Sequence, residues 1–114
     1  MPRRLENITS EPIQEHTLEA ENITVEIILR WLPQVGSWFA DVIYEDKARY
    51  GIRLVVGTLH IESANMPLDI VVIDNSELGL DPTRQDDFST RRCDLIVAMP
   101  NDMEEIRGVP VPIQ

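Results

Sequence analysis

The sequence holds a single cysteine, few aromatic residues and no long apolar run. Cys93 alone cannot form an intramolecular disulfide, and one thiolate does not make a zinc site. The longest strictly aliphatic run is Ile70–Ile73, whereas a membrane-spanning helix needs about 20 apolar residues. Polar residues follow the charged start of the chain, so no signal peptide is evident. These absences favour a protein of a reducing compartment with no membrane partner.

Positive charge is also scarce. The 114 residues, a length that suits one domain, include 10 Lys and Arg against 20 Asp and Glu, a formal net charge of −10 at pH 7. A surface of that sign repels phosphate backbones and anionic lipid headgroups, so we expect no nucleic-acid partner. The cations between Gln14 and Pro82 are too few to follow a phosphate backbone; they are Arg30, Lys47, Arg49 and Arg53.

Alternation of apolar and polar residues is the strongest pattern present. Five apolar residues at every second position predict a strand over residues 23–31; they are Ile23, Val25, Ile27, Leu29 and Trp31. Similar but shorter patterns predict strands at about residues 14–20, 38–44, 49–56, 68–74 and 93–99. Five or six short strands without a long helix indicate an all-β domain, either a small barrel or a sandwich.

Turn chemistry adds two local expectations. Residues 33–37 contain Pro and Gly, and they predict a hairpin turn that brings Trp31 close to Trp38. The tryptophan pair suits core packing best, with an interface anchor or a platform for a small ligand as alternatives. Gly51 lies inside a predicted strand, which is typical of a bulge or a sharp bend.

Candidate chemical sites are few. His16 and His60 lack carboxylates or cysteines at metal-ligand spacing, so both are interpreted as surface or edge-strand histidines. Cys93 is interpreted as a buried thiol rather than a nucleophile. No grouping supplies a nucleophile, a base and an orienting partner together, so we expect neither catalysis nor a cofactor.

One acidic cluster follows the strand expected at residues 68–74. Its members are Asp74, Asn75, Ser76, Glu77, Asp81, Asp86 and Asp87. Their oxygens could hold calcium, but the spacing does not fit the twelve-residue calcium loop, so a solvated loop is favoured. The fragment Asp81-Pro82-Thr83 predicts a turn in which the Asp side chain accepts backbone N–H groups.

The two ends of the chain differ from its middle. Residues 1–13 show neither strand nor helix periodicity, which predicts an arm that is disordered or becomes ordered only on a partner. The alternation of Val and Pro from Val109 to Ile113 favours polyproline II and leaves an apolar tail. The candidate protein-interface residues there are Val109, Val111 and Ile113.

The order of several short motifs resembles that of a known family. They are Ile27–Trp31, a turn with Gly36, Trp38–Val42, Gly51–Gly57, Gly79–Thr83 and Asp86–Phe88 before the last strand. In this order and spacing they resemble the OB-fold plug proteins of contractile-tailed bacteriophage baseplates.

The resemblance covers about residues 14–99. It implies an OB-like barrel of five or six strands there. The N-terminal arm at residues 1–13 and the C-terminal tail at residues 100–114 extend beyond the compact domain of that family. It also implies a non-enzymatic virion protein, made in the host bacterial cytoplasm, at the centre of the tail baseplate. Several copies would then pack beside the hub, spike and tail-tube proteins. The alternative function is a small-ligand or carbohydrate-binding β-barrel that uses Trp31 and Trp38.

Overall fold

The computed structural model describes residues 3–20, 23–61 and 68–98. All regular structure in these ranges is β, which confirms the all-β class. The strands are β1 (Arg3–Arg4), β2 (Ile13–Ala20), β3 (Ile23–Leu32), β4 (Ser37–Tyr44), β5 (Lys47–Arg53), β6 (Asp69–Asp74) and β7 (Cys93–Ala98). In this part of the chain, no helix is long and apolar enough to cross a membrane.

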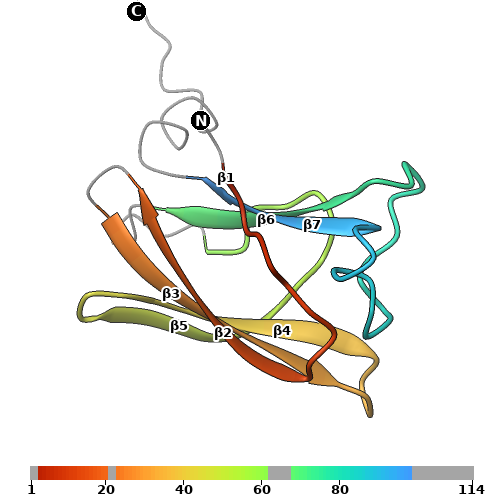
Figure 1. The fold of residues 1–114 in the computed structure, drawn as a ribbon, viewed down its shortest axis with the longest axis horizontal. Helices are drawn as coiled ribbons and strands as arrows, with labels where there is room; N and C mark the ends of the chain where they lie inside the picture. Colours follow the sequence, from red (N-terminus) through yellow and green to blue (C-terminus); the bar gives the residue numbers. More distant parts are fainter. Residues whose placement is uncertain (1–2, 21–22, 62–67, 99–114) are drawn as a thin grey trace, which may run out of the picture.

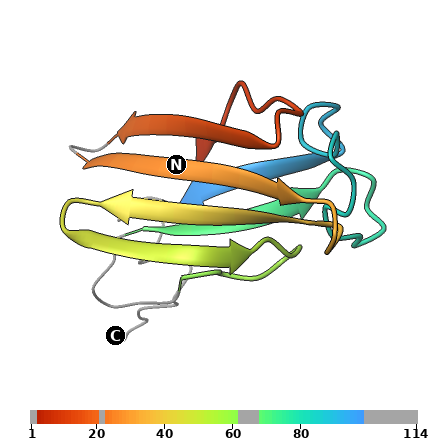
Figure 2. The same ribbon diagram turned by 90° about the horizontal axis from the view of Figure 1, so that it is seen from below.

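The strands form two antiparallel sheets that face each other, as Figures 1 and 2 show. One sheet has the order β2-β3-β4-β5 and the other the order β1-β7-β6. The expected closed barrel does not form in the described residues, because no strand ladder joins the edges of the two sheets. The chain after β5 crosses between the sheets instead, with a single parallel bridge from Val56 to Val72 in β6. The domain is therefore a β-sandwich.

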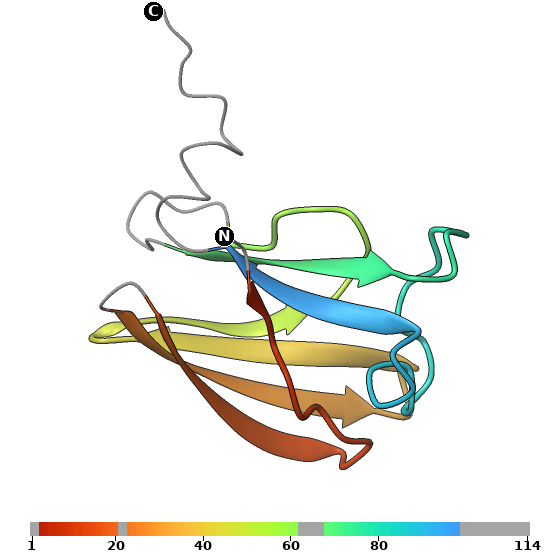
Figure 3. The same ribbon diagram turned by 45° about the horizontal axis from the view of Figure 1, so that its top comes forward.

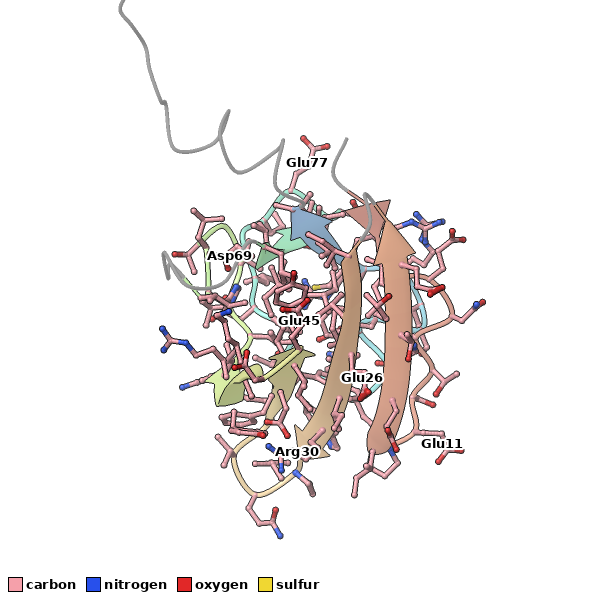
Figure 4. The ribbon with its side chains drawn as sticks, turned by 90° about the vertical axis from the view of Figure 1, so that its left-hand side faces the viewer. Glu11, Glu26, Arg30, Glu45, Asp69 and Glu77 are labelled. Atoms are coloured by element: carbon pink, nitrogen blue, oxygen red, sulfur yellow. The ribbon has the colours of Figure 1, made fainter. Side chains whose placement is uncertain are left out.

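The β3–β4 hairpin has the predicted register. Trp31 lies opposite Trp38, and the backbone N–H of Gly36 donates to the Leu32 carbonyl in the turn at 2.8 Å. Along β3 the buried residues alternate with exposed ones, because successive side chains of a strand point to opposite faces. Glu26 and Arg30, labelled in Figure 4, lie on the face that points away from the second sheet.

A β-bulge interrupts the pairing of β4 with β5, as the glycine in β5 predicted. The register shifts between Ala40 and Val42, opposite Gly51, whose φ is 66°. The buried carboxylate of Asp41 accepts a hydrogen bond from the Gly51 backbone N–H at 2.8 Å and another from Arg30 at 2.7 Å. A side chain thus supplies a hydrogen bond where the bulge breaks the regular ladder.

The hydrophobic core lies between the two sheets. The largest fully buried side chains come from both sheets and from the crossing segment; they are Trp38, Ile27, Leu29, Leu54, Leu68, Ile70, Leu95, Val25, Val42, Val72 and Val97. Because β4 also carries Phe39 and Ile43 on its outer face, that strand is apolar on both sides. Its inner face packs in the core, and on its outer face Ser37 and Asp41 are also buried while Phe39 and Ile43 are half-buried.

The N-terminal segment differs from the expected arm, because part of it belongs to the domain. Arg3 and Arg4 pair with β7, and the backbone N–H of Leu5 donates to the Leu95 carbonyl at 2.7 Å. The Leu5 side chain is only 5% exposed and joins the core. A strand of two residues has no detectable periodicity, so its pairing with β7 could not be read from the local sequence.

Candidate protein-protein interface

Large apolar side chains are exposed mainly at one end of the sandwich. Those that belong to this end are Ile13, Leu32, Val35, Ile73, Leu78 and Leu80, and Leu78 is 72% exposed. Figures 1 and 3 show the start of β2, the β3–β4 turn and residues 75–92 together there. We call these three segments the loop end. Several exposed apolar side chains on loops of a rigid scaffold are typical of a protein-contact surface.

The shape of residues 75–92 depends on Arg92. Its guanidinium donates to the carbonyls of Leu80 at 3.1 Å and Asp81 at 2.7 Å. It also binds the two carboxylate oxygens of Asp87 at 2.9 Å and 3.0 Å and lies 3.0 Å from Asp74. A guanidinium has five N–H donors in a fixed planar geometry, so one side chain can bind several parts of a loop at once. The loop is therefore braced from within.

Asp74 ends β6 and organises the first part of this loop. It is buried and accepts hydrogen bonds from the Ser76 hydroxyl at 2.6 Å, the Ser76 N–H at 2.9 Å and the Leu80 N–H at 2.8 Å. The bonds from Ser76 and from the Leu80 backbone hold the pKa of Asp74 well below its usual value, and the Arg92 charge acts in the same direction. The carboxylate stays ionised and keeps Leu80 near the end of the sheet.

Asp87 plays the matching role in the second part of the loop. Burial pushes its pKa upward, but the hydrogen bonds from Arg92 and from the Arg84 backbone N–H outweigh burial and leave the pKa lowered. Asp87 is 3% exposed and Asp74 is 8% exposed. The interpretation of the whole acidic cluster as a solvated loop is therefore wrong for these two residues, because the chain's own donors surround their carboxylates.

Trp38 connects the loop to the four-stranded sheet. Its indole N–H donates to the Arg84 carbonyl at 3.1 Å, and its ring packs edge-on against Phe88 with centroids 5.8 Å apart. The ring centroid of Trp31 lies 5.7 Å from that of Trp38. Trp38 is fully buried, which confirms core packing for this ring, whereas Trp31 is half-buried against the core. The ring of Trp38 has no exposed face on which a ligand could stack.

Four further residues singled out from the sequence are Asp81, His60, His16 and Cys93. Asp81 accepts a hydrogen bond from the N–H of Val56, a distant residue, rather than from its own turn. His60 accepts the Val55 N–H at 3.0 Å on its Nε2 atom. Burial lowers the pKa of His16 and raises the pKa of the Cys93 thiol to about 11. The expectation of a buried Cys93 is confirmed.

Residues 5–100 match the protein family described as cyanophage baseplate Pam3 plug gp18. The chain belongs to this plug family. The match confirms the resemblance to phage baseplate plug proteins that the motif order indicated. The plug protein is accordingly a structural component of the virion tail baseplate, where it assembles with other baseplate proteins. No curated protein matches the chain.

One feature of the plug protein was not predicted from the sequence, and one prediction lies outside the residues that the structure describes. The Arg92 network was missed, although an acidic loop that ends in Arg91-Arg92 was a signal that could have indicated it. Val109, Val111 and Ile113, the interface residues expected in the tail, lie outside the described residues, and their role stays a prediction.

Proposed function

We propose that this plug protein is a non-enzymatic assembly component at the centre of a contractile-tail baseplate. Several copies lie about the tail axis and contact the hub, spike and tail-tube proteins, after synthesis in the cytoplasm of the bacterial host. The observation that carries this proposal is the family match over residues 5–100. The braced loop end supplies a surface of the kind that such contacts require.

The internal bracing favours docking at the loop end. Ordering a loop on binding costs free energy, so a loop already held by Arg92, Asp74 and Asp87 loses less when a partner covers it. Leu78 and Leu80 offer apolar area to that partner, being 72% and 52% exposed. Burial of these side chains against a neighbouring subunit explains why the loop end is apolar and why it is held in one conformation.

The C-terminal tail supplies a second contact in this proposal. Val109, Val111 and Ile113 are the residues that carry it, because their alternation with proline gives an extended apolar segment. Deletion of residues 108–114 is expected to weaken assembly with the hub. Unchanged assembly would show that the tail makes no contact on which assembly depends.

The test is co-expression of the plug protein with the hub, spike and tail-tube proteins of the same phage. Size-exclusion chromatography and mass determination then measure whether the proteins elute together. The proposal expects elution at a fixed stoichiometry. A plug protein that elutes alone while its partners assemble would contradict the proposed role.

A further inference from the structure

The outer edge strand β5 is unlike the rest of this acidic molecule. It carries Lys47, Arg49 and Arg53 and no carboxylate, in a chain of net charge −10. Among the described residues, neither Arg49 nor Arg53 forms an ion pair, and Lys47 lies 3.8 Å from the exposed Asp46. The nearby buried carboxylate, Asp41, is already bound by other groups. The positive charge of β5 is therefore largely unneutralised.

This edge also has free capacity for pairing. In the described part of the chain β5 forms a ladder with β4 alone, so its other side presents unpaired backbone N–H and C=O groups. Tyr50, in the middle of the strand, is 70% exposed. Two copies of β5 would repel each other, because like charges on adjacent strands are destabilising. A strand that adds to this edge should be acidic.

The C-terminal segment of the same chain has matching chemistry. Its first part carries the acidic residues Asp102, Glu104 and Glu105 with one cation, Arg107. Its second part alternates valine with Pro110 and Pro112.

The first part of such a segment can add to an open sheet edge. The prolines that follow have no N–H donor, so the added strand ends before Pro110. Acidic residues that precede the prolines would meet Lys47, Arg49 and Arg53.

We propose that the β5 edge, Lys47–Arg53, receives the first part of the C-terminal segment, residues 102–108, of a neighbouring copy as an added strand. This inference rests on the proposed function, in which several copies surround the tail axis. Donor and acceptor are different parts of the chain, so each copy gives its tail to the next. Contacts of this head-to-tail type produce a ring when the rotation between copies closes.

Disulfide trapping between two full-length variants tests this proposal. One variant carries Tyr50→Cys and the other carries Ile106→Cys, and they are mixed under mild oxidation. The native Cys93 is buried and contributes little background. The matched control pairs Ile106→Cys with Leu78→Cys, because Leu78 and Tyr50 are similarly exposed. Non-reducing gel electrophoresis and mass spectrometry measure the yield of linked dimer.

The proposal expects about tenfold more dimer from the Tyr50 pair than from the Leu78 pair, because pairing raises the local concentration of the two thiols. Arg49→Glu in the acceptor should lower the yield about fivefold, and Glu104→Lys with Glu105→Lys in the donor should restore it. Equal yields from the two pairs would overturn the proposal. So would a double variant, Tyr50→Cys with Ile106→Cys, that links only within one chain at every concentration.

Co-elution with the hub, measured on the same variants under reducing conditions, separates the two claims. Variants that elute with the hub but give no dimer above control would overturn tail exchange and leave the proposed function intact. Variants that give the dimer but never elute with the hub would support the β5 contact and count against the baseplate role.

Discussion

The guanidinium of Arg92 binds both carboxylate oxygens of Asp87, with Nε 2.9 Å from Oδ1 and Nη2 3.0 Å from Oδ2. A two-point contact of this kind fixes orientation as well as distance. Because the same side chain also reaches Asp74 and two loop carbonyls, the shape of the loop end depends on the one residue that immediately precedes β7. The stability of the fold and the shape of the proposed docking surface are therefore linked.

Arg92→Ala is expected to lower the free energy of unfolding by about 3 kcal/mol, because it leaves two buried carboxylates without their cation. Arg92→Lys should lower the free energy of unfolding by about half as much, since an ammonium keeps the charge but not the planar set of donors. Urea unfolding followed by tryptophan fluorescence measures both. The exposed neighbour Arg91 is the control, and Arg91→Ala should change stability by less than about 1 kcal/mol. Equal losses at the two positions would contradict the bracing role.

Stability is expected to fall in acid. The folded-state pKa values of Asp74 and Asp87 lie below the unfolded value of about 3.9, so the folded protein binds fewer protons than the unfolded chain as the pH falls. Their contribution is complete above about pH 5 and is lost as the pH decreases through the folded-state values. Urea midpoints between pH 7 and pH 2 measure this dependence.

Asparagine variants assign the pH dependence to these two groups. Asp74→Asn and Asp87→Asn should each be less stable at pH 7 and should show a weaker loss of stability in acid than the unmodified protein. Asp86→Asn is the control, because Asp86 is exposed in the same loop. A pH dependence unchanged in both variants would show that other carboxylates cause it.

Trp38→Phe is expected to destabilise the protein by about 2 to 3 kcal/mol. The substitution removes the hydrogen bond to the Arg84 carbonyl and leaves space in the core beside Phe88. Trp31→Phe should cost less, because Trp31 is only half-buried and its indole N–H forms no hydrogen bond with the residues that the structure describes. Thermal unfolding of the two variants gives the comparison, and a larger loss for Trp31→Phe would be inconsistent with the structure.

Gly51→Ala is expected to cost about 1 to 2 kcal/mol through backbone conformation alone. The residue has φ 66°, where a Cβ atom is strained, yet no other atom lies near the position of that Cβ. Gly51→Asn should cost less, because asparagine tolerates this conformation better than alanine. Circular dichroism during chemical unfolding checks the order of the three proteins, and an alanine variant as stable as the glycine protein would argue against the bulge.

The strands were predictable because their signal is local. Alternation over Ile23–Trp31 and the turn at residues 33–37 were enough to place the β3–β4 hairpin, and the glycine in β5 was enough to place its bulge. Periodicity left barrel and sandwich open, and the barrel that the resemblance implied was wrong for the described residues. That distinction depends on which sheet edges pair, and edge pairing joins residues far apart in the chain.

The loop end was less predictable for the same reason. Arg92 and Asp74 lie at opposite ends of the segment that joins β6 to β7, and they contact each other. Trp38, in the four-stranded sheet, donates a hydrogen bond to Arg84 in that segment. The sequence separation of the two residues in each contact is not one that a sequence motif specifies. The carboxylates of the cluster were visible in the sequence, but their burial followed only from the fold.

Co-assembly of loop-end variants tests the central claim most directly, namely that this plug protein works by docking its braced loop end in the baseplate. Leu78→Asp with Leu80→Asp places two charges on the proposed surface, and Thr58→Asp places one on an exposed segment elsewhere. Size-exclusion chromatography with the hub, spike and tail-tube proteins measures the fraction bound. The account predicts that the double variant folds but loses at least about tenfold in binding, while Thr58→Asp binds normally. A double variant that elutes with the hub at the original stoichiometry would contradict it.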